Sequence, residues 1–323
     1  MIYAPICIPT LNRYEHLRKC LESLSRCTWA DKTEVYIALD YPPLDQWDKY
    51  APGWEKNRDW LRSIGDFGFK KLHLIERTEN YGIWTNESGK RTNSAALIED
   101  YIVGKYENYI YTEDDNVFSP CFLEYMNKGY ELFKDDPKVV CISGYRFYFP
   151  IVADNNTFFR QTVDYAPWGC MRVGMHKIPK VDYHWFRKHL SIRVLHKLRK
   201  DYGMGSVCSF ISMCSKQGNI HPVDRHCWTY MQVMDYEQIT PVHNLVRNIG
   251  LDGSGQCYDA RHEEWASEEN NPISTDEHFV FVGTGYEHFA ENKRIYYQGK
   301  YWMTEKQYFV KACKKLVKFI IGK

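Results

Sequence analysis

"YIYTEDDNVFSP", residues 109–120, sets three acidic residues directly after an apolar segment of the kind that forms a buried strand. Adjacent like charges repel each other and resist burial, so Glu113, Asp114 and Asp115 need a cation, a cap or solvent as a partner. Open α/β sheets bind their ligands at the carboxyl ends of strands, before a helix. The stretch therefore predicts an α/β sheet with a Mg²⁺ or Mn²⁺ site at its edge. The alternative is that Glu113 and Asp114 cap the following turn and Asp115 is simply exposed.

Short apolar strands alternate with amphipathic helices through the first half of the chain. This alternation is typical of a mostly parallel sheet that is flanked by helices on both faces. The expected strands cover residues 2–8, 33–40, 70–76, 108–112 and 138–144. A helix is expected over residues 91–104, closed by Gly104.

Two further helices are predicted together with their caps. Residues 10–27 place leucines on one helical stripe, with Asn12 as the N-cap and Glu15 as its capping-box partner. The helix after the acidic run is expected to open with Ser119 as its cap and Pro120 at its first position. Each of these helices would follow a strand of the sheet.

Charge and composition argue against nucleic acid as a partner. The chain has 42 Lys and Arg against 41 Asp and Glu, a net charge of +1, so no global field attracts a polyanion. Aromatic residues reach 16%, which suits either flat sugar and base surfaces or an aromatic core. Function is therefore expected to reside in a local site.

The cysteines, the histidines and the first residues bear on metal sites and location. None of the 11 cysteines forms a C-x-x-C pair, and the 12 histidines show no H-E-x-x-H spacing, so neither a disulfide framework nor a zinc site is predicted. Reduced, buried thiols favour a cytosolic compartment. "MIYAPICIPT" lacks a basic start with a long apolar run, and no apolar stretch could cross a bilayer, so we expect a cytoplasmic protein.

The acidic stretch, read with the segments around it, resembles glycosyltransferases of the A-type fold. Residues 111–127 resemble their acidic, DXD-type metal-binding motif, and residues 5–24 resemble the first strand and helix of family 2-like bacterial polysaccharide glycosyltransferases. Other similar segments are the strand 35–40, the R-x-x-N-x-G run 77–82, "APWGCMRVG" (166–174) and "PVHNLVRNIGLDGSG" (241–255). The E-D-D run followed by S-P also resembles N-acetylglucosaminyltransferase I. The resemblance implies a Rossmann-like donor-binding sheet with an acceptor-binding carboxyl-terminal lobe.

The resemblance implies that the nucleotide sugar binds beside the first two strands. Pro9, Thr10 and Arg13 stand in the family's P-T-x-N-R pattern and would lie near the nucleotide. Asp40 would read the base, because a carboxylate can accept the imide N–H of uracil. The alternative for Asp40 is a turn cap.

The same resemblance implies roles for residues at the ends of the next strands. Arg77 and Asn80 would contact the nucleotide or its ribose, although Arg77 can equally pair with a neighbouring glutamate. Asp114 would span the ribose and the metal region. Asp115 would bind the Mn²⁺ or Mg²⁺ ion, with Glu113 as a further metal ligand.

An inverting sugar transfer needs a base that takes the acceptor hydroxyl proton during attack. In similar bacterial enzymes an acidic residue precedes a tryptophan segment, and "PVDRHCWTYMQV" (222–233) offers Asp224 in that position. Asp224 is therefore the predicted base, with Asp182 and Asp235 as rivals and a structural pair with a neighbouring arginine or histidine as the alternative. The relatives often carry a histidine soon after N-I-G, whereas here the first is His262.

The resemblance implies a metal-dependent, inverting glycosyltransferase that moves a sugar from a UDP-linked donor to a saccharide or lipid-linked saccharide acceptor in bacterial surface polysaccharide or glycan synthesis. Residues 1–150 would bind the nucleotide sugar, 151–260 would hold the acceptor and the base, and 261–323 would form an extension. A nucleotidyltransferase is one alternative, although "CIPTLNRYEH" lacks that class's Gly-rich loop. A non-catalytic carbohydrate-binding protein with the same fold is the other.

The last segment, "YFVKACKKLVKFIIGK" (308–323), has the pattern of a basic amphipathic helix. Phe309, Cys313, Leu316 and Ile320 recur at helical spacing and are flanked by lysines. Such a helix can lie on an anionic membrane, here at the inner face of the plasma membrane, or pack on the body with a solvated lysine face. The sequence leaves both alternatives open.

Overall fold

The structure is a computed structural model that describes residues 3–80, 98, 101–102, 104–147, 149–163, 165–173, 183–214, 223–255, 267–269, 272–300 and 303–321. The strands are β1 (Ile6–Thr10), β2 (Glu34–Leu39), β3 (Lys71–Glu76), β4 (Ile110–Tyr111), β5 (Asn116–Phe118), β6 (Val139–Ser143), β7 (Phe158–Gln161), β8 (Cys170–Met171), β9 (Glu237–Pro241) and β10 (Val246–Asn248). The α-helices are α1 (Tyr14–Ser25), α2 (Trp47–Ser63), α4 (Phe122–Phe133), α5 (Tyr183–Lys188), α6 (Ile192–Cys214), α7 (Val223–Met234), α9 (Phe289–Lys300) and α10 (Glu305–Ile321). Short 3₁₀ helices are η1 (Ala30–Lys32) and η2 (Leu44–Gln46).

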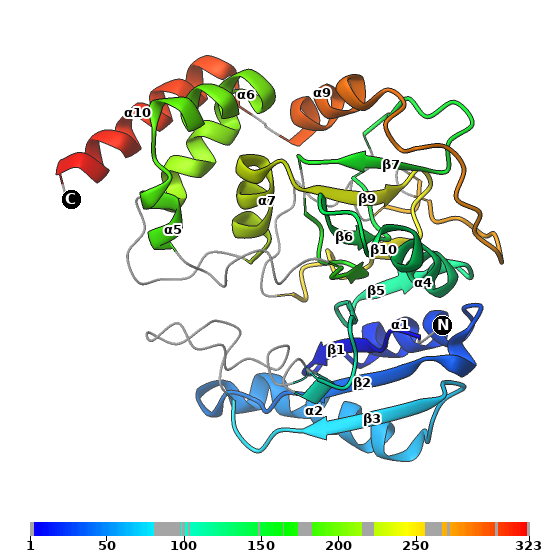
Figure 1. Ribbon diagram of the computed structural model, residues 1–323. Coiled ribbons are helices and arrows are strands. Elements are labelled where there is room, and N and C mark those ends of the chain that lie inside the picture. Colours follow the sequence, from blue (N-terminus) through cyan, green and yellow to red (C-terminus); the bar gives the residue numbers. More distant parts are fainter. Residues whose placement is uncertain are drawn as a thin grey trace.

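A mostly parallel sheet runs through the described part of the chain, with its eight strands in the order β3-β2-β1-β4-β8-β6-β9-β7. Neighbours among β3, β2, β1 and β4 are parallel, as are β6 and β9, while β8 and β7 are antiparallel to the strands beside them. Figure 1 shows α1 and α2 beside β1–β3, and α5, α6, α7 and α10 gathered away from them. The predicted α/β class with a mostly parallel sheet is confirmed.

Apolar side chains of β1 pack on both faces of the sheet. Ile6 and Ile8 belong to the same buried cluster as Leu17 of α1, whereas Cys7 between them packs with Ile98 on the other face. Only Gly residues commonly adopt the backbone of Gly104 (φ +83°), which follows the helical residues 101–102. The rest of the helix expected over 91–104 lies, apart from residue 98, outside the described residues.

Both predicted helix caps are wrong, because tertiary contacts use the residues differently. Helix α1 starts one residue later than the capping box requires: its N-cap is Arg13, no side chain caps it, and Glu15 pairs with Lys56 at 3.0 Å instead. Ser119 does not cap α4, whose N-cap is Cys121. The backbone N–H of Ser119 donates to Leu245 O at 2.9 Å, so this residue extends the β5–β10 pairing and the helix begins only after it.

The sheet continues across residue 150, since β7, β8 and β9 join strands from the first half of the chain. The functional division at residues 150 and 260 remains a prediction. Helix α2 occupies a stretch for which the sequence predicted no element. Among the helices in the described ranges, none is both long enough and apolar enough to cross a membrane. Of the ten cysteines that the structure describes, none is in a disulfide and nine are buried.

Candidate active site

The acidic run lies beside the end of β1. Strands β1 and β4 are parallel neighbours, with Ile6 opposite Ile110 and Cys7 opposite Tyr111. The strand order changes direction here: β2 and β3 lie on one side of β1 and β4 on the other. Parallel sheets form their ligand crevices outside the carboxyl ends of strands at such a reversal. The fold therefore brings Thr10 at the end of β1 next to the residues that follow β4.

Arg13 joins the two aspartates of the run. Its guanidinium lies 2.5 Å from Asp114 Oδ1 and 2.8 Å from Asp115 Oδ2, and the Thr10 hydroxyl donates to Asp114 Oδ2 at 2.6 Å. Both aspartates are buried, with 4% and 5% of their surfaces exposed. Burial opposes the charge on Arg13, but the two carboxylates outweigh it and raise the pKa of Arg13. A positive charge thus already lies between two buried carboxylates.

A second element fixes Asp115 from the other side. Strand β10 pairs antiparallel with β5, and its register sets Asn248 opposite Asn116. Asn248 Nδ2 donates to Asp115 Oδ1 at 2.7 Å, and Ile249 N donates to Asp115 O at 2.7 Å. Both carboxylate oxygens of Asp115 are therefore engaged, one by an amide and one by a guanidinium.

The loop after β10 passes over this cluster at Gly250. A Cβ at position 250 would lie 2.0 Å from Asp115 Oδ2 and 2.8 Å from Arg13 Nη1, so any side chain would collide with the cluster. Further along the loop, Asp252 Oδ2 lies 3.2 Å from Nε2 of His16 on α1. The loop after β10 therefore lies directly against Arg13 and Asp115 at Gly250.

Glu113 has a different environment from the aspartates. Its Oε2 accepts a hydrogen bond of 2.9 Å from the indole N–H of Trp168, which comes from the "APWGCMRVG" segment. Burial, followed by the negative charge of Asp115, raises the pKa of Glu113 to about 8. Burial also raises the pKa of Asp115. Glu113 is thus expected to hold a proton at neutral pH.

Glu113→Gln is expected to flatten the pH dependence of stability. The carboxyl of Glu113 has a pKa of about 8 when folded against 4.5 ordinarily, so its stabilising contribution is full below about pH 4.5 and is lost as the pH rises to about 8. The loss should be on the order of 3 kcal/mol in the free energy of unfolding. Urea unfolding at pH 5.5 and pH 8.5 measures it, with the exposed Glu55→Gln on α2 as the control. Equal pH dependence in Glu113→Gln and wild type would contradict the assignment.

The other predicted donor-binding residues gather at the ends of β2 and β3. The backbone N–H of Asp40 donates to Thr10 O at 2.9 Å, which ties this group to the acidic cluster. Arg77 Nη1 lies 4.0 Å from Asp40 Oδ1, and Asn80 Nδ2 donates to Tyr41 O at 2.5 Å. Asp40 Oδ1 also accepts the N–H of Tyr41 at 2.9 Å, as the turn-cap alternative expects. The fold thus brings Thr10, Asp40, Arg77 and Asn80 to one edge of the sheet, at the carboxyl ends of β1, β2 and β3.

Pro9 lies in β1 in register with Ala38 of β2, one residue before Thr10. The predicted base, Asp224, is exposed in the first turn of α7, and its Oδ1 accepts the N–H of Arg225 at 2.8 Å. Its rival Asp235 pairs with Lys197 at 2.8 Å. Asp182 and His262 lie outside the described residues.

Sequence reasoning missed two residues of the site, Asn248 and Gly250. Both belong to "PVHNLVRNIGLDGSG", but the run contains two asparagines and nothing local tells them apart. Asn244 binds the backbone of Arg146 through both ends of its amide, at 2.6 and 2.9 Å, whereas Asn248 binds Asp115. The β5–β10 register decides which asparagine reaches the acidic run.

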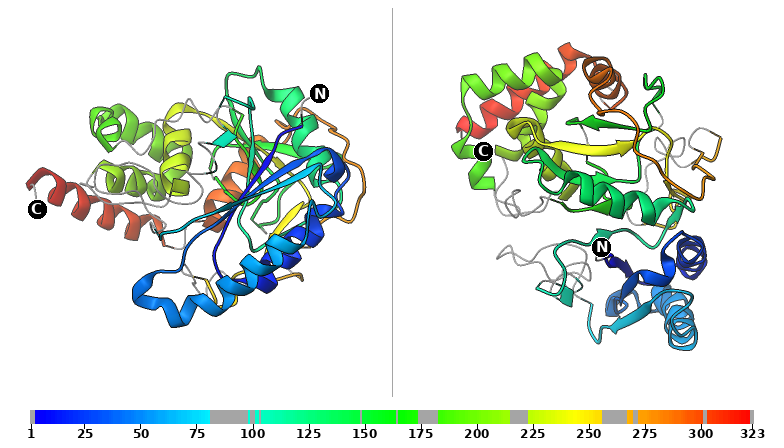
Figure 2. Two further views of the ribbon diagram at one scale, coloured as in Figure 1. Left: turned by 90° about the horizontal axis from the view of Figure 1, so that it is seen from below. Right: turned by 45° about the vertical axis from the view of Figure 1, so that its right-hand side comes forward.

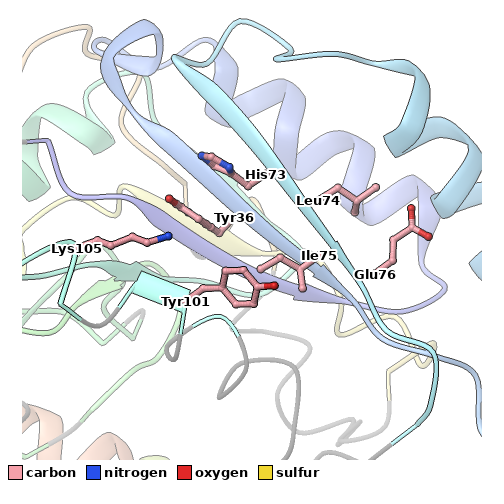
Figure 3. A pocket seen from close by; sticks show the side chains of 7 residues that line it. All are labelled: Tyr36, His73, Leu74, Ile75, Glu76, Tyr101 and Lys105. Atoms are coloured by element: carbon pink, nitrogen blue, oxygen red, sulfur yellow. The ribbon is translucent and has the colours of Figure 1, made fainter.

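A cavity of about 420 Å³ lies away from the acidic run, on β2 and β3. Its lining residues are Tyr36, His73, Leu74, Ile75, Glu76, Tyr101 and Lys105 (Figure 3). Tyr36 stacks on His73 with 4.2 Å between ring centroids, and His73 Nε2 lies 2.9 Å from Glu34. Two of its polar side chains, Tyr36 and His73, are thus engaged by contacts within the protein.

No protein-family model matches the sequence, and no curated protein matches it either. Solved structures with a similar arrangement include the mannosyltransferase PcManGT from Pyrobaculum calidifontis, in complex with GDP-Man and Mn²⁺, at 13% identity over 99% of this chain and 76% of that one, with a TM-score of 0.42. TarS of S. aureus with UDP-GlcNAc shows 13% identity over 54% of this chain and 46% of that one, TM-score 0.33. The glycosyltransferase GlyE of Streptococcus pneumoniae TIGR4 shows 12% identity over 73% and 45%, TM-score 0.31.

Proposed function

We propose that this chain is a metal-dependent, inverting glycosyltransferase that uses a UDP-linked sugar and a saccharide acceptor in bacterial surface polysaccharide or glycan synthesis, in the cytoplasm. The observation that carries the proposal is the cluster of Thr10, Arg13, Asp114 and Asp115 at the reversal of strand order. Paired carboxylates at this place suit a divalent cation that binds the diphosphate of a nucleotide sugar.

The neighbouring residues suit the rest of the donor. Asp40 and Arg77, at the ends of β2 and β3, offer an acceptor for a base N–H and a cation for ribose or phosphate oxygens. Asn80 adds an amide next to them. The donor would therefore extend from this group, which binds the nucleoside, to Asp114 and Asp115 at its diphosphate.

The residues of the acidic run fit a divalent metal that arrives with the donor. The described residues contain no group of three or more His, Cys, Asp or Glu able to hold a metal by themselves. Mg²⁺ is commonly held by one or two carboxylates plus substrate phosphates, so Asp115 is a sufficient protein share, and Glu113 would join it on losing its proton as the cation arrives. When bound, the ion would offset the charge that develops on the departing diphosphate. On Oδ2 the ion would compete with Arg13, which pairs with that oxygen.

The protein's own groups would carry the remaining chemistry. In an inverting transfer the acceptor oxygen attacks the anomeric carbon opposite the diphosphate, and a carboxylate takes its proton. Asp224 is proposed for this role because it is an exposed carboxylate at the start of α7. Arg13, released from Asp115, would stay within reach of the diphosphate and stabilise its charge.

Arg13→Gln is expected to reduce stability and to increase the effect of metal. Without Arg13 the buried carboxylates of Asp114 and Asp115 lose their cation, a loss of about 3–5 kcal/mol for a buried pair. Mn²⁺ would then raise the melting temperature more in the variant than in wild type, because its competitor is absent. Arg18→Gln, which removes the surface pairs of Arg18 with Glu15 and Glu22 on α1, is the control. An equal Mn²⁺ shift in Arg13→Gln and wild type would show that the ion does not compete with Arg13.

The proposed function is tested by calorimetry with UDP, GDP, CDP and dTDP, each with and without Mn²⁺, followed by transfer assays with sugars of the nucleotide that binds. Metal-dependent binding of one nucleotide and sugar release to a saccharide support the proposal. Glycan binding with no nucleotide binding would favour the non-catalytic alternative. Formation of a nucleotide sugar from a sugar phosphate would favour the nucleotidyltransferase.

A further inference from the structure

The carboxyl-terminal helix α10 is fixed to the body along one side. Ala312 is 3% exposed and packs in the cluster that contains α6, together with the half-buried Tyr308 and Leu316. Lys315 donates to the Ser212 hydroxyl. Figure 1 and the left view of Figure 2 show α10 along α6 at the periphery of the molecule. On this side, α10 therefore packs on the body of the protein, which is one of the two alternatives that the sequence left open.

The opposite side of α10 is apolar and exposed. Phe309 is 52% exposed, Val317 52% and Ile320 72%. The complete outer face consists of Phe309, Val310, Cys313, Val317, Ile320 and Ile321, all exposed. These positions recur every three or four residues, so they form one continuous stripe along the helix. A contiguous apolar stripe on a soluble surface marks a site of contact.

Exposed lysines border this outer face. Lys306, Lys311, Lys314 and Lys318 all lie in α10 and are exposed, and the only acidic residue of the helix is Glu305 at its start. Glu305 is occupied, since it accepts the N–H of Met204 at 3.1 Å. The helix thus combines an apolar stripe with uncompensated positive charge, the composition of helices that lie in a lipid interface.

We propose that the outer face of α10 docks on an anionic lipid bilayer. The apolar side chains would enter the boundary between headgroups and acyl chains, while the lysines extend to the lipid phosphates. A second copy of the chain fits this face less well, because two such helices would bring their lysines together with no acidic residue between them. The charge pattern therefore selects a negatively charged surface as the partner.

The packed side of α10, opposite the docked face, lies near the start of α7 in the proposed acceptor region. Burial raises the pKa of Cys208, and the charges of Lys315, Lys311 and Arg225 oppose that rise, so all three lie near this thiol of α6. Arg225 follows Asp224 at the start of α7. Membrane docking would thus hold Asp224 near a lipid-linked saccharide; this consequence, unlike the docking itself, rests on the proposed function.

Vesicle sedimentation of the full-length chain tests the docking without any nucleotide sugar. We expect binding to phosphatidylcholine vesicles that contain phosphatidylglycerol, weakened by salt, and little binding to phosphatidylcholine alone. The double variant Val317→Asp/Ile320→Asp should bind at background level. Leu44→Asp, at a residue that is 79% exposed in η2, is the matched control and should bind like wild type. Lys314→Gln/Lys318→Gln should lose at least about tenfold in partition coefficient, against no change in Lys19→Gln on α1.

A second measurement reports on the helix itself. Among the described cysteines Cys313 is the exposed one, and it lies within the outer face. Cys257, the one cysteine outside the described residues, is replaced by serine so that the label goes to Cys313. The emission of an environment-sensitive fluorophore on Cys313 should then shift to the blue with anionic vesicles. The proposal is overturned if wild type ignores anionic vesicles or if the aspartate double variant binds as wild type does. A dimer in light scattering that the double variant dissociates, with no vesicle binding, would assign the face to self-association instead. If the wild-type chain binds vesicles but transfers no sugar, the proposed function is contradicted and the docking stands.

Discussion

Asp115→Ala is expected to abolish metal-dependent binding of the nucleotide and to lower kcat/KM for sugar transfer about a thousandfold. Asp115 is the carboxylate that two elements fix in place, by Asn248 from β10 and by Arg13 from the start of α1. Alanine removes the proposed metal ligand and leaves Arg13 paired with Asp114 alone. The measurement is calorimetric titration of UDP with and without Mn²⁺, with initial rates of transfer beside it.

The fold of Asp115→Ala should survive, so loss of binding can be read as loss of the site. Burial raises the pKa of Asp115, which means that its charge is unfavourable in the folded protein, and alanine relieves that penalty while it gives up two hydrogen bonds. Asp135→Ala, an exposed aspartate that follows α4, serves as the control for a lost surface carboxylate. Nucleotide binding that needs no metal and does not change with Asp115→Ala would return the acidic run to a purely structural role.

Local sequence predicted those parts of the molecule whose periodicity is unambiguous. The first three strands are short apolar runs between turns. Strands β2 and β3 lie where the pattern set them, whereas β1 (Ile6–Thr10) overlaps the expected residues 2–8 only in part. The acidic run could be assigned to the end of a strand because the apolar segment stops abruptly at Glu113. What the pattern could not show is β5, a short strand between the run and α4, which exists because β10 pairs with it.

The wrong caps and the missed site residues have one physical cause. Ser119 and Asn12 have side chains that cap helices well in isolation, yet distant contacts decide the backbone at both places. Asn248 reaches Asp115 across 133 residues of chain. No window of local sequence contains both residues, so only the register of two short strands can reveal the contact. The assignment of Asp224 as the base stays a prediction.

Gly250→Ala is expected to weaken nucleotide binding about a hundredfold, because the new Cβ would lie 2.0 Å from Asp115 Oδ2 and 2.8 Å from Arg13 Nη1. Gly250 does not have a positive φ, so alanine could adopt its backbone conformation. The substitution is expected to fail because the Cβ would collide with its neighbours. Crowding of a buried site also lowers the free energy of unfolding by about 1–3 kcal/mol. Denaturant unfolding and UDP–Mn²⁺ titration measure the two effects.

Gly255→Ala in the same loop is the matched control. Its Cβ would lie 3.5 Å from Arg13 Nη1, an ordinary contact, and it also lacks a positive φ. Both substitutions lower the conformational entropy of the unfolded chain, which stabilises the folded state by about 0.4–1 kcal/mol. Because this contribution is equal in the two variants, it cancels when they are compared. A hundredfold difference between the two variants would mean that the space beside Asp115 is part of the donor site. Equal binding by both would mean that the loop after β10 can move away, and that the contact of Gly250 with the acidic cluster does not limit binding.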